Sequence, residues 1–383
     1  MNEARELKRG RFSALGAVLA ALFLLAFAST VSVPENAVAQ TNERTVEEPS
    51  PVGGNVPGGH LGADSDTELW RAVRGGIQGT VSIPNKQAGQ MIQSGGESWR
   101  AWRNGPITVV GGSALLVMIG VIALFFLVRG RVRIDAGPSG KTIERFNGIE
   151  RFAHWLTAVC FIILALTGLN MLYGRHALLP ALGPDLFATI TQLGKYAHNY
   201  LAFGFMAGIA LMFVLWVRHN LPDRYDIEWL AQGGGVLFKG AHPPSKKFNA
   251  GQKIIFWSVI LGGLSISLSG ISLLFPFEFS MFATTFAALN LVGFGLPTDL
   301  TPMQEMHYAQ MWHAWVSLGL IAIVIGHIYI GSLGMEGAFD AMGTGHVDEN
   351  WAREHHSIWV AEVKGEPIPD PDDHGPPKAQ PAE

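Results

Sequence analysis

Four histidines occupy apolar stretches in which a membrane-spanning helix would ordinarily hold no ionisable residue: His154, His198, His313 and His327. Imidazole within hydrocarbon is costly without a partner, so each is a functional-site candidate. His313 and His327 share one stretch and lie fourteen residues apart. At about 100° per residue, fourteen steps return to within about 40° of the starting direction and advance about 21 Å. One helix face thus presents two imidazoles at two depths, which suits two haems, since neutral imidazole is an axial ligand of haem iron.

The composition predicts an all-α integral membrane protein. Of 383 residues, 48% are hydrophobic and 15% are charged, whereas soluble domains average about 25% charged residues. The net charge of −4 gives no argument for a nucleic-acid partner. The single cysteine, Cys160, excludes an internal disulfide and any Cys-rich cluster. Because Cys160 lies in an apolar stretch, we interpret it as a packing residue.

The first 106 residues precede the apolar core of the sequence. Residues 1–39 read as a signal peptide, with a basic start, an apolar run over 12–33 and the cleavage pattern Ala37-Val38-Ala39. A retained signal anchor is the alternative. Residues 40–106 form a Gly/Pro-rich segment without periodicity, placed in the periplasm if residues 1–39 are exported. Its Trp and Arg residues, such as Trp99 and Trp102, suit either a docking surface or a loose linker.

Five apolar stretches follow, each close to the length that a helix needs to cross a bilayer. The first, 107–128, is an extra transmembrane helix, and the other four belong to a four-helix domain over 129–335, which is followed by a tail over 336–383. The stretches are Ile107–Val128, Phe152–Tyr173, Ala197–Val217, Ile254–Phe275 and Met311–Ile330.

The loop charges orient these helices. Loops 129–151 and 218–253 each hold six Lys or Arg residues, whereas loop 174–196 holds two and loop 276–310 holds none. By the positive-inside rule the two basic loops are cytoplasmic, and so is the tail, whose Pro/Asp-rich end reads as disordered. We therefore expect a multi-pass protein of the bacterial inner membrane.

The same topology assigns a depth to each histidine. His154 and His327 lie near the cytoplasmic ends of their helices, and His198 and His313 lie near the outer ends. The depths predict two bis-histidine sites, His154 with His327 and His198 with His313, each binding the iron of a b-type haem. His307, twenty residues before His327, points about 200° away around the helix and is interpreted as a surface residue. The adjacent residues His355 and His356 are interpreted as solvated.

The ordered pattern of residues resembles a known family. It comprises Arg145-Phe-Asn-Gly-Ile-Glu-Arg-Phe-Ala-His154-Trp155, then His198, then Phe248-Asn249-Ala250-Gly251-Gln252-Lys253, then His313 and His327. It is similar to the cytochrome b (gamma) subunit of respiratory formate dehydrogenases and, in general plan, to the cytochrome b subunits of hydrogenases. The resemblance covers about residues 140–335, implies a four-helix dihaem bundle, and carries over the same two histidine pairs. The signal peptide, the outer segment and the extra helix depart from it.

The resemblance implies electron transfer from a formate-oxidising catalytic subunit, with molybdenum or tungsten, and an iron–sulfur subunit, across the membrane to quinone. No formate-oxidising site is expected in this chain. The alternatives are a cytochrome b subunit of a hydrogenase or of another molybdoenzyme. A structural anchor or a transporter without haem is an alternative of a different class, but transporters show broken helices and buried acidic residues.

A quinone site is expected at the cytoplasmic start of the fourth stretch. Asn249 offers both a donor and an acceptor for a quinone carbonyl, Gly251 leaves space for a headgroup, and His327 lines the pocket from the haem side. Gln252 and Lys253 are weaker candidates. A helix N-cap would account for Asn249 about as well.

The charge asymmetry of the loops gives a testable topology. A reporter fused after Gly240 should read cytoplasmic, because it follows a loop rich in Lys and Arg, and a reporter after Leu291 should read external. Paired alkaline phosphatase and green fluorescent protein fusions measure both sides. Reversed readouts would contradict the assigned depths of all four histidines.

Overall fold

Five long apolar helices dominate the structure, a computed structural model that describes residues 96–237 and 240–368. Those long enough to cross a membrane are Ser98–Arg129, Gly148–Ala177, Pro184–His219, Ala250–Leu274 and Pro302–Gly334. Each of the five predicted stretches lies within one of these helices or overlaps it closely, and each helix is longer than the apolar stretch that predicted it. The chain is thus a multi-pass membrane protein with a predominantly helical fold. The predicted signal peptide, 1–39, lies outside the described residues.

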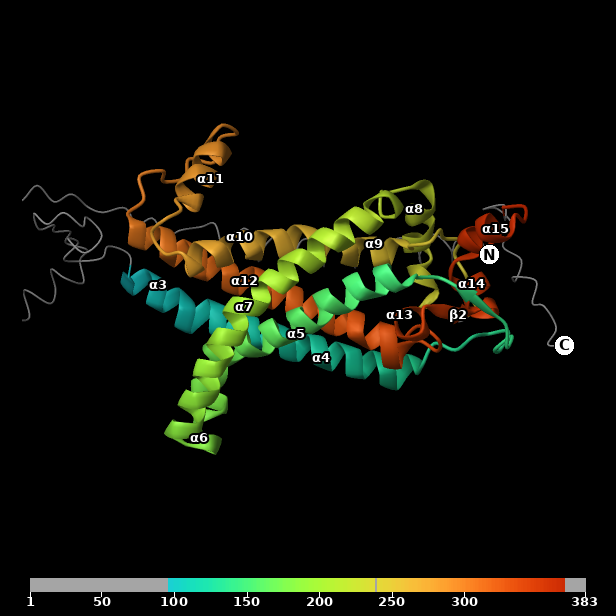
Figure 1. Ribbon diagram of the computed structural model, residues 1–383, viewed down its shortest axis with the longest axis horizontal. Coiled ribbons are helices and arrows are strands. Elements are labelled where there is room, and N and C mark those ends of the chain that lie inside the picture. Colours follow the sequence, from blue (N-terminus) through green and yellow to red (C-terminus); the bar gives the residue numbers. More distant parts are fainter. Residues whose placement is uncertain (1–95, 238–239, 369–383) are drawn as a thin grey trace, which may run out of the picture. The chain divides into compact units, whose positions relative to one another are not determined.

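The elements follow one another along the chain with short connections (Figure 1). In order they are α3 (Gly96–Trp102), η2 (Arg103–Ile107), α4 (Thr108–Arg129), β1 (Thr142–Glu144), α5 (Gly148–Ala177), α6 (Leu179–Leu182), α7 (Pro184–Trp216), η3 (Val217–His219), α8 (Arg224–Ala231), η4 (Gly233–Gly235), α9 (Ala250–Trp257), η5 (Ser258–Gly262), α10 (Gly263–Leu274), α11 (Met281–Asn290), α12 (Pro302–Tyr329), η6 (Ile330–Gly334), α13 (Asp340–Gly343), β2 (His346–Asp348), α14 (Glu349–His355) and α15 (Ser357–Lys364).

The described residues divide into two compact units, and the smaller one combines residues 96–106 with Ser272–Met311. Within it, both carboxylate oxygens of Glu305 accept 2.8 Å hydrogen bonds from the N–H groups of Phe282 and Ala283, at the start of α11. Of the segment 40–106, only residues 96–106 are described. They are helical rather than a loose linker, and Trp99 stacks on His307 with ring centroids 5.2 Å apart. A π-turn contains Pro106, which lacks the N–H that a regular helix would use.

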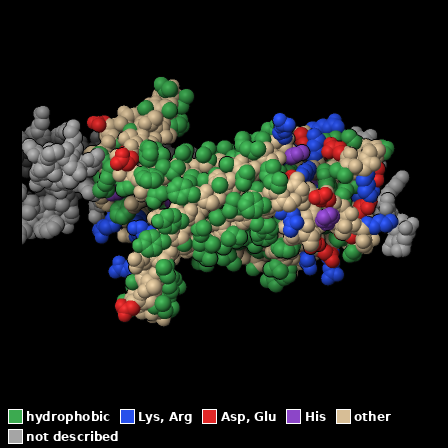
Figure 2. All heavy atoms as spheres, viewed as in Figure 1, with side chains coloured by type: hydrophobic (Ala, Val, Ile, Leu, Met, Phe, Trp, Pro, Cys, Tyr) green, Lys and Arg blue, Asp and Glu red, His purple; other side chains and the backbone are tan. Residues whose placement is uncertain are grey.

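The larger unit comprises Ile107–Ile271 and the residues from Trp312 onward. Within it, α5 and α7 pack side by side along much of their length. The contact depends on glycine, because a Cβ at Gly204 would lie 2.9 Å from the Cys160 sulfur and one at Gly208 would collide with Thr157. Cys160 is buried there, as predicted. Hydrophobic side chains cover the sides of α4, α5 and α7, while charged side chains gather around α13–α15 (Figure 2).

Helix α5 begins where a capping box fixes it. The Asn147 side chain accepts hydrogen bonds from the N–H groups of Ile149 and Glu150, both at 3.0 Å, and the Glu150 carboxylate accepts one from the Asn147 N–H. The box satisfies N–H groups that a helix start leaves unpaired. It therefore sets the position of His154, seven residues further along the same helix.

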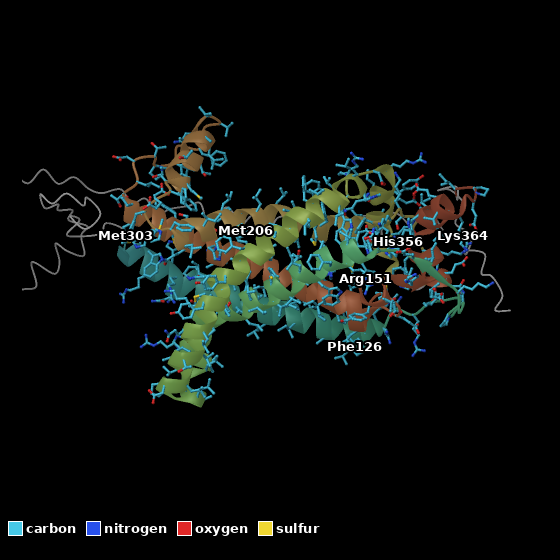
Figure 3. The ribbon with its side chains drawn as sticks, in the orientation of Figure 1. Phe126, Arg151, Met206, Met303, His356 and Lys364 are labelled. Atoms are coloured by element: carbon cyan, nitrogen blue, oxygen red, sulfur yellow. The ribbon has the colours of Figure 1, made fainter. Side chains whose placement is uncertain are left out.

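The residues after α12 form a folded element, the terminal cap (residues 335–366). Strand β2 pairs antiparallel with β1, with Ile143 opposite Val347, so the segment before α5 is joined to the segment after α12. On α5, Arg151 donates hydrogen bonds to the carbonyl oxygens of Met342 and Gly343 (Figure 3). The prediction of a plain tail over 336–383 is thus wrong for residues 336–366, while residues 369–383 lie outside the described range.

The centre of the terminal cap is a buried arginine. The Arg145 guanidinium lies 5.0–5.5 Å from the ring centroids of Phe146, Trp351 and Trp359, and its Nη2 donates to the carbonyl oxygen of Lys247 at 2.6 Å. Burial lowers the pKa of Arg145 to about 9, and the charge of Glu150 opposes this shift. The aromatic faces supply part of the stabilisation that water would otherwise give the cation.

His356 is the second member of this buried group, so the prediction that His355 and His356 are solvated is wrong (Figure 3). His356 is 1% exposed. Arg145 donates to its Nε2 at 2.9 Å, which leaves Nδ1–H to donate to the Lys246 carbonyl oxygen at 2.8 Å. Solvation was predicted because both histidines lie in a segment that read as a tail. In the structure, the β1–β2 pairing places this segment against the aromatic side chains around Arg145.

The two histidines predict a pH-dependent cap. Burial, and then the charges of His242 and Arg145, lower the pKa of His355 to about 3, and burial also lowers the pKa of His356 well below its usual value. The unfolded cap therefore binds more protons than the folded cap below pH of about 6.5, and stability present above that pH is lost as the pH falls toward 3. The slope should be about 1.4 kcal/mol per pH unit for each histidine.

Hydrogen exchange of residues 346–364 at pH 7 and pH 5, corrected for intrinsic rates, measures this slope, with α5 and α7 as internal references. His356→Gln should remove about half of it. Equal protection of the cap at both pH values would contradict the prediction.

Candidate functional site

Helix α12 carries two histidines that each meet a histidine of another helix. The ring centroids of His154, on α5, and His327 lie 6.2 Å apart at an interplanar angle of 62°. Those of His198, on α7, and His313 also lie 6.2 Å apart, at 61°. All four side chains are at least partly buried. The structure therefore brings together the two pairs that the loop charges and spacing had indicated, with nearly the same geometry in each.

Hydroxyl groups orient both rings of the His198–His313 pair. Thr167 Oγ1 lies 2.8 Å from His198 Nδ1, and Ser269 Oγ lies 3.0 Å from His313 Nδ1. Both hydroxyls also reach backbone carbonyl oxygens of their own helices. The Nε2 atoms make no hydrogen bond within the described residues, so these are the nitrogens available to a ligand. Sequence reasoning missed Thr167 and Ser269, whose only signal was a hydroxyl within an apolar stretch.

Two glycines bring helix backbones against this pair. A Cβ on Gly168, in α5, would lie 3.6 Å from Cε1 of His198, and one on Gly270, in α10, would lie 3.4 Å from Cε1 of His313. Both distances are ordinary van der Waals contacts, so each glycine leaves the imidazole edge close to a bare backbone. The rings are consequently held between α5, α7, α10 and α12.

The His154–His327 pair differs in its support. His154 Nδ1 is buried and has no hydrogen-bond partner among the described residues. The next residue is Trp155, whose Nε1 donates to the carbonyl oxygen of Met342 at 2.9 Å, which ties this end of α5 to the terminal cap. The position of His154 is thus fixed by the capping box and by the cap rather than by a bond to its own ring.

The ring spacing fits a metal held between two imidazoles. Two metal–nitrogen bonds of about 2 Å, with about 1 Å from each nitrogen to its ring centre, give about 6 Å between the centres, against the observed 6.2 Å. At Gly319 and Gly326 on α12, an added Cβ would meet no other described atom within 4 Å, although both residues are partly buried. The donor type, the spacing and these side-chain-free positions all suit haem.

His307 has a different environment from the four paired histidines. Its ring partner is Trp99, with an interplanar angle of 16°, and it is partly buried rather than fully at the surface. The expectation that it does not join the other histidines agrees with this stacking. Its interpretation as a surface residue is wrong, because the helix over 96–102 had not been expected.

The residues expected at the quinone site lie at the start of α9. Asn249 is the N-cap of this helix, and its Oδ1 accepts a 3.0 Å hydrogen bond from the Gln252 N–H. A Cβ on Gly251 would lie 2.8 Å from the Trp229 ring, so the space at Gly251 is bounded by an indole from α8. Lys253 is paired with Asp223 at 3.0 Å and Asp226 at 2.8 Å. The backbone N–H of Asn249 donates to Gln252 Oε1 at 3.1 Å, whereas its side-chain nitrogen Nδ2 makes no hydrogen bond within the described part of the chain and remains able to donate.

Comparison with known proteins identifies the family. The model of the family described as prokaryotic cytochrome b561 matches residues 145–345, more than half of the chain. The chain belongs to the prokaryotic cytochrome b561 family. This membership makes it a membrane cytochrome b of electron transport and implies b-type haem, and the residues that could hold haem are the paired histidines above.

Several similar proteins are named as cytochrome b556 subunits of formate dehydrogenases. The nitrate-inducible formate dehydrogenase cytochrome b556(Fdn) subunit of Escherichia coli K12 is 30% identical over 226 residues, 58% of this chain and 93% of the relative. The formate dehydrogenase cytochrome b556(fdo) subunit of the same strain is 30% identical over 224 residues, 58% and 94%. The Haemophilus influenzae formate dehydrogenase cytochrome b556 subunit is 26% identical over 224 residues, 57% and 83%. The resemblance inferred from the sequence is confirmed.

The family match covers the helices that carry the paired histidines. The match begins at Arg145, the buried cation of the terminal cap, and ends at Gly345, directly before β2. Helix α4 lies before the matched residues, and β2, α14 and α15 lie after them.

Proposed function

We propose that this cytochrome b is the membrane subunit of a respiratory formate dehydrogenase, that it holds two b-type haems, and that these carry electrons across the membrane to quinone. The observation that carries the proposal is the presence of two histidine pairs with the same 6.2 Å spacing, both sharing α12. His154 and His327 would ligate one haem, and His198 and His313 the other. The names of the relatives support the choice of formate dehydrogenase over hydrogenase or another molybdoenzyme.

The chain itself supplies ligands, orientation and an apolar environment. Thr167 and Ser269 fix the rings of His198 and His313 by contact with Nδ1, which keeps Nε2 directed to the metal. Such contacts also hold each ring in one tautomer. Because α12 supplies one ligand to each pair, the two sites are held at a constant separation by a single rigid helix.

The partners in this proposal are a catalytic subunit with molybdenum or tungsten and an iron–sulfur subunit. The full sequence has one cysteine and so cannot hold a cysteine-ligated iron–sulfur cluster by itself. The excess of Lys and Arg in loops 129–151 and 218–253 supports a cytoplasmic position for the His154–His327 pair and the terminal cap. Formate oxidation would then take place on the outer side, beside the His198–His313 pair.

Quinone is proposed to bind beside the start of α9, with Asn249, Gly251 and His327 in its site. The Asn249 cap holds Oδ1 in place and leaves the amide N–H groups to donate to a quinone carbonyl. Trp229 lies against Gly251 and would provide an aromatic wall. This arrangement supports a role for Gly251 in admitting the indole rather than in leaving an open space.

Substitution of the paired histidines tests the haem proposal. The purified protein should hold two b haems per chain, and His154→Ala and His327→Ala should each remove the same one, since both leave a single ligand. His198→Ala and His313→Ala should remove the other. Pyridine haemochrome quantitation and low-temperature reduced-minus-oxidised spectra measure the number and identity of the haems. His307→Ala is the matched control and should retain both, whereas loss of different haems by His154→Ala and His327→Ala would contradict the pairing.

Substitution of Asn249 separates its two roles. Asp and Ser cap a helix about as well as Asn, but neither has an amide N–H. Asn249→Asp and Asn249→Ser should therefore retain both haems and slow their reduction by a water-soluble quinol about tenfold, the effect of one lost hydrogen bond. Stopped-flow absorbance at the haem band measures the rate. Wild-type rates in both variants would show that Asn249 serves only as a cap.

A further inference from the structure

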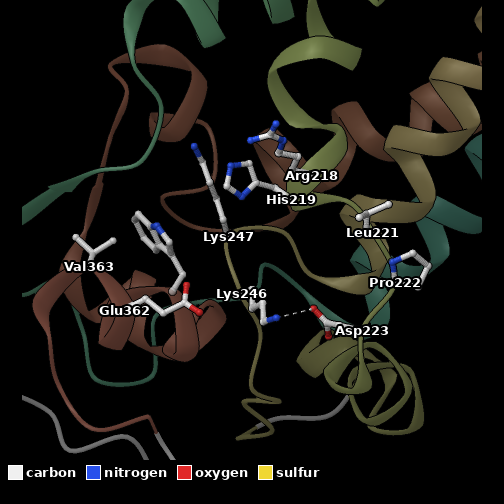
Figure 4. A pocket seen from close by; sticks show the side chains of 10 residues that line it. Arg218, His219, Leu221, Pro222, Asp223, Lys246, Lys247, Glu362 and Val363 are labelled. Carbon is white, nitrogen blue, oxygen red and sulfur yellow. Dashed lines mark ion pairs between the residues drawn. The ribbon is translucent and has the colours of Figure 1, made fainter.

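A pocket of 530 Å³ lies at the end of the span Pro184–His219, within the larger unit (Figure 4). Three segments form it: the turn after α7, the loop before α9, and α15 of the terminal cap. Its lining residues are Arg218, His219, Leu221, Pro222, Asp223, Lys246, Lys247, Trp359, Glu362 and Val363. Helix α15 lies beyond the residues that the family model matches.

The cations of the pocket are only partly neutralised. Arg218 is exposed and makes no ion pair with any residue in the described ranges. Lys246 lies 3.5 Å from Asp223, but that carboxylate also binds Lys253 at the shorter distance of 3.0 Å. The side chain of Lys246 is 43% exposed. Arg218 and Lys246 therefore both remain available to an anion.

The third cation and the second carboxylate have other roles. Lys247 donates to Glu150 Oε1 at 2.6 Å and lies 4.9 Å from the Phe146 ring centroid, so its charge is already compensated. Glu362 is exposed on α15 and faces the pocket from the opposite side (Figure 4). The negative charge of Glu362 opposes anion binding, so removing that charge should strengthen the binding of an anion.

Apolar side chains accompany the cations. Leu221 is 55% exposed and Val363 is 56% exposed, and Pro222 lies beside Leu221 in the lining. Trp359 is buried and packs in the terminal cap beside Arg145. A small soluble anion would gain nothing from the exposed Leu221 and Val363, whereas the first carbons of a lipid chain would cover them.

We propose that this pocket binds the phosphate group of an anionic phospholipid, with Arg218 and Lys246 supplying the positive charge that attracts it and Leu221, Pro222 and Val363 beside the start of the acyl chains. Basic pockets at the water boundary of membrane helices are suited to such headgroups. The position at the end of a membrane span places the cations at headgroup depth. The inference requires only that span boundary and does not rest on the electron-transfer proposal.

The test uses the full-length protein in nanodiscs of phosphatidylcholine containing a small fraction of phosphatidylglycerol. Native mass spectrometry after transfer to detergent counts the phosphatidylglycerol that each chain retains. Arg218→Gln and Lys246→Gln should each weaken retention about fivefold, the effect of one charge near the membrane surface. Arg131→Gln and Arg133→Gln are the matched controls, because both side chains are exposed just after α4 and neither lines the pocket. These controls should retain lipid as the wild type does.

Glu362→Gln should strengthen lipid retention about fivefold by removing the opposing charge, a gain that misfolding would not produce. Equal losses in the Arg218, Lys246, Arg131 and Arg133 variants would overturn the proposal, and so would unchanged retention in Glu362→Gln. Competition with millimolar inorganic phosphate distinguishes a lipid phosphate group from a free phosphate ion as the natural ligand. Retention that persists in phosphate supports a lipid, whereas displacement by phosphate would show a soluble-anion pocket and overturn the lipid assignment.

Discussion

The distance between paired imidazoles is the constraint on which the rest of this structure depends. A metal held between two histidines would set the separation of their ring centres at about 6 Å, and the two histidine pairs of this structure lie at 6.2 Å. Helices α5, α7 and α12 must therefore hold their backbones at set distances over much of their length. The glycines at 204 and 208 allow α5 and α7 to meet closely, and Gly168 and Gly270 bring backbone against the rings of His198 and His313.

The two pairs are held by different means. Around His198 and His313, the hydroxyls of Thr167 and Ser269 make contacts between helices, which in membranes are worth about 0.6 kcal/mol on average. Their larger contribution is orientation, because each fixes a ring rather than a helix. Around His154, orientation comes from outside the apolar region, through the Asn147 capping box and the Trp155 bond to the terminal cap. The terminal cap thus contributes to the position of a histidine pair within the apolar helices.

The features that could be predicted from the sequence are those set by a single helix or by its orientation in the membrane, namely the helix positions and the depths of the histidines. The spans followed from apolar length, and the pairing of His154 with His327 followed from depth, because a bilayer imposes a common axis on every helix. Features that depend on distant contacts were missed. Thr167 and Ser269 each bond a carbonyl of their own helix as well as an imidazole, so a hydroxyl in an apolar stretch does not by itself indicate a partner.

The terminal cap was missed for a related reason. Its aromatic residues and His356 are buried only because β2 pairs with β1, across about two hundred residues of sequence. Likewise, Gly251 was predicted to leave open space, because the neighbouring sequence does not show that the Trp229 side chain reaches it from α8. The folded segment 335–366 has no periodic pattern strong enough to separate it from a tail.

The β1–β2 pairing also determines the order in which the molecule can be completed. Strand β1 precedes α5 and leaves the ribosome early, but it stays unpaired until β2 emerges after α12. Loop closure of this length is slow and costly in chain entropy. The four helices of the shared region therefore enter the membrane with their basic end still open, and Arg145 acquires its aromatic surroundings only when Trp351 and Trp359 arrive. The surroundings of Arg145 are therefore the last part of the described fold that can be completed, because they need α14 and α15, which follow β2.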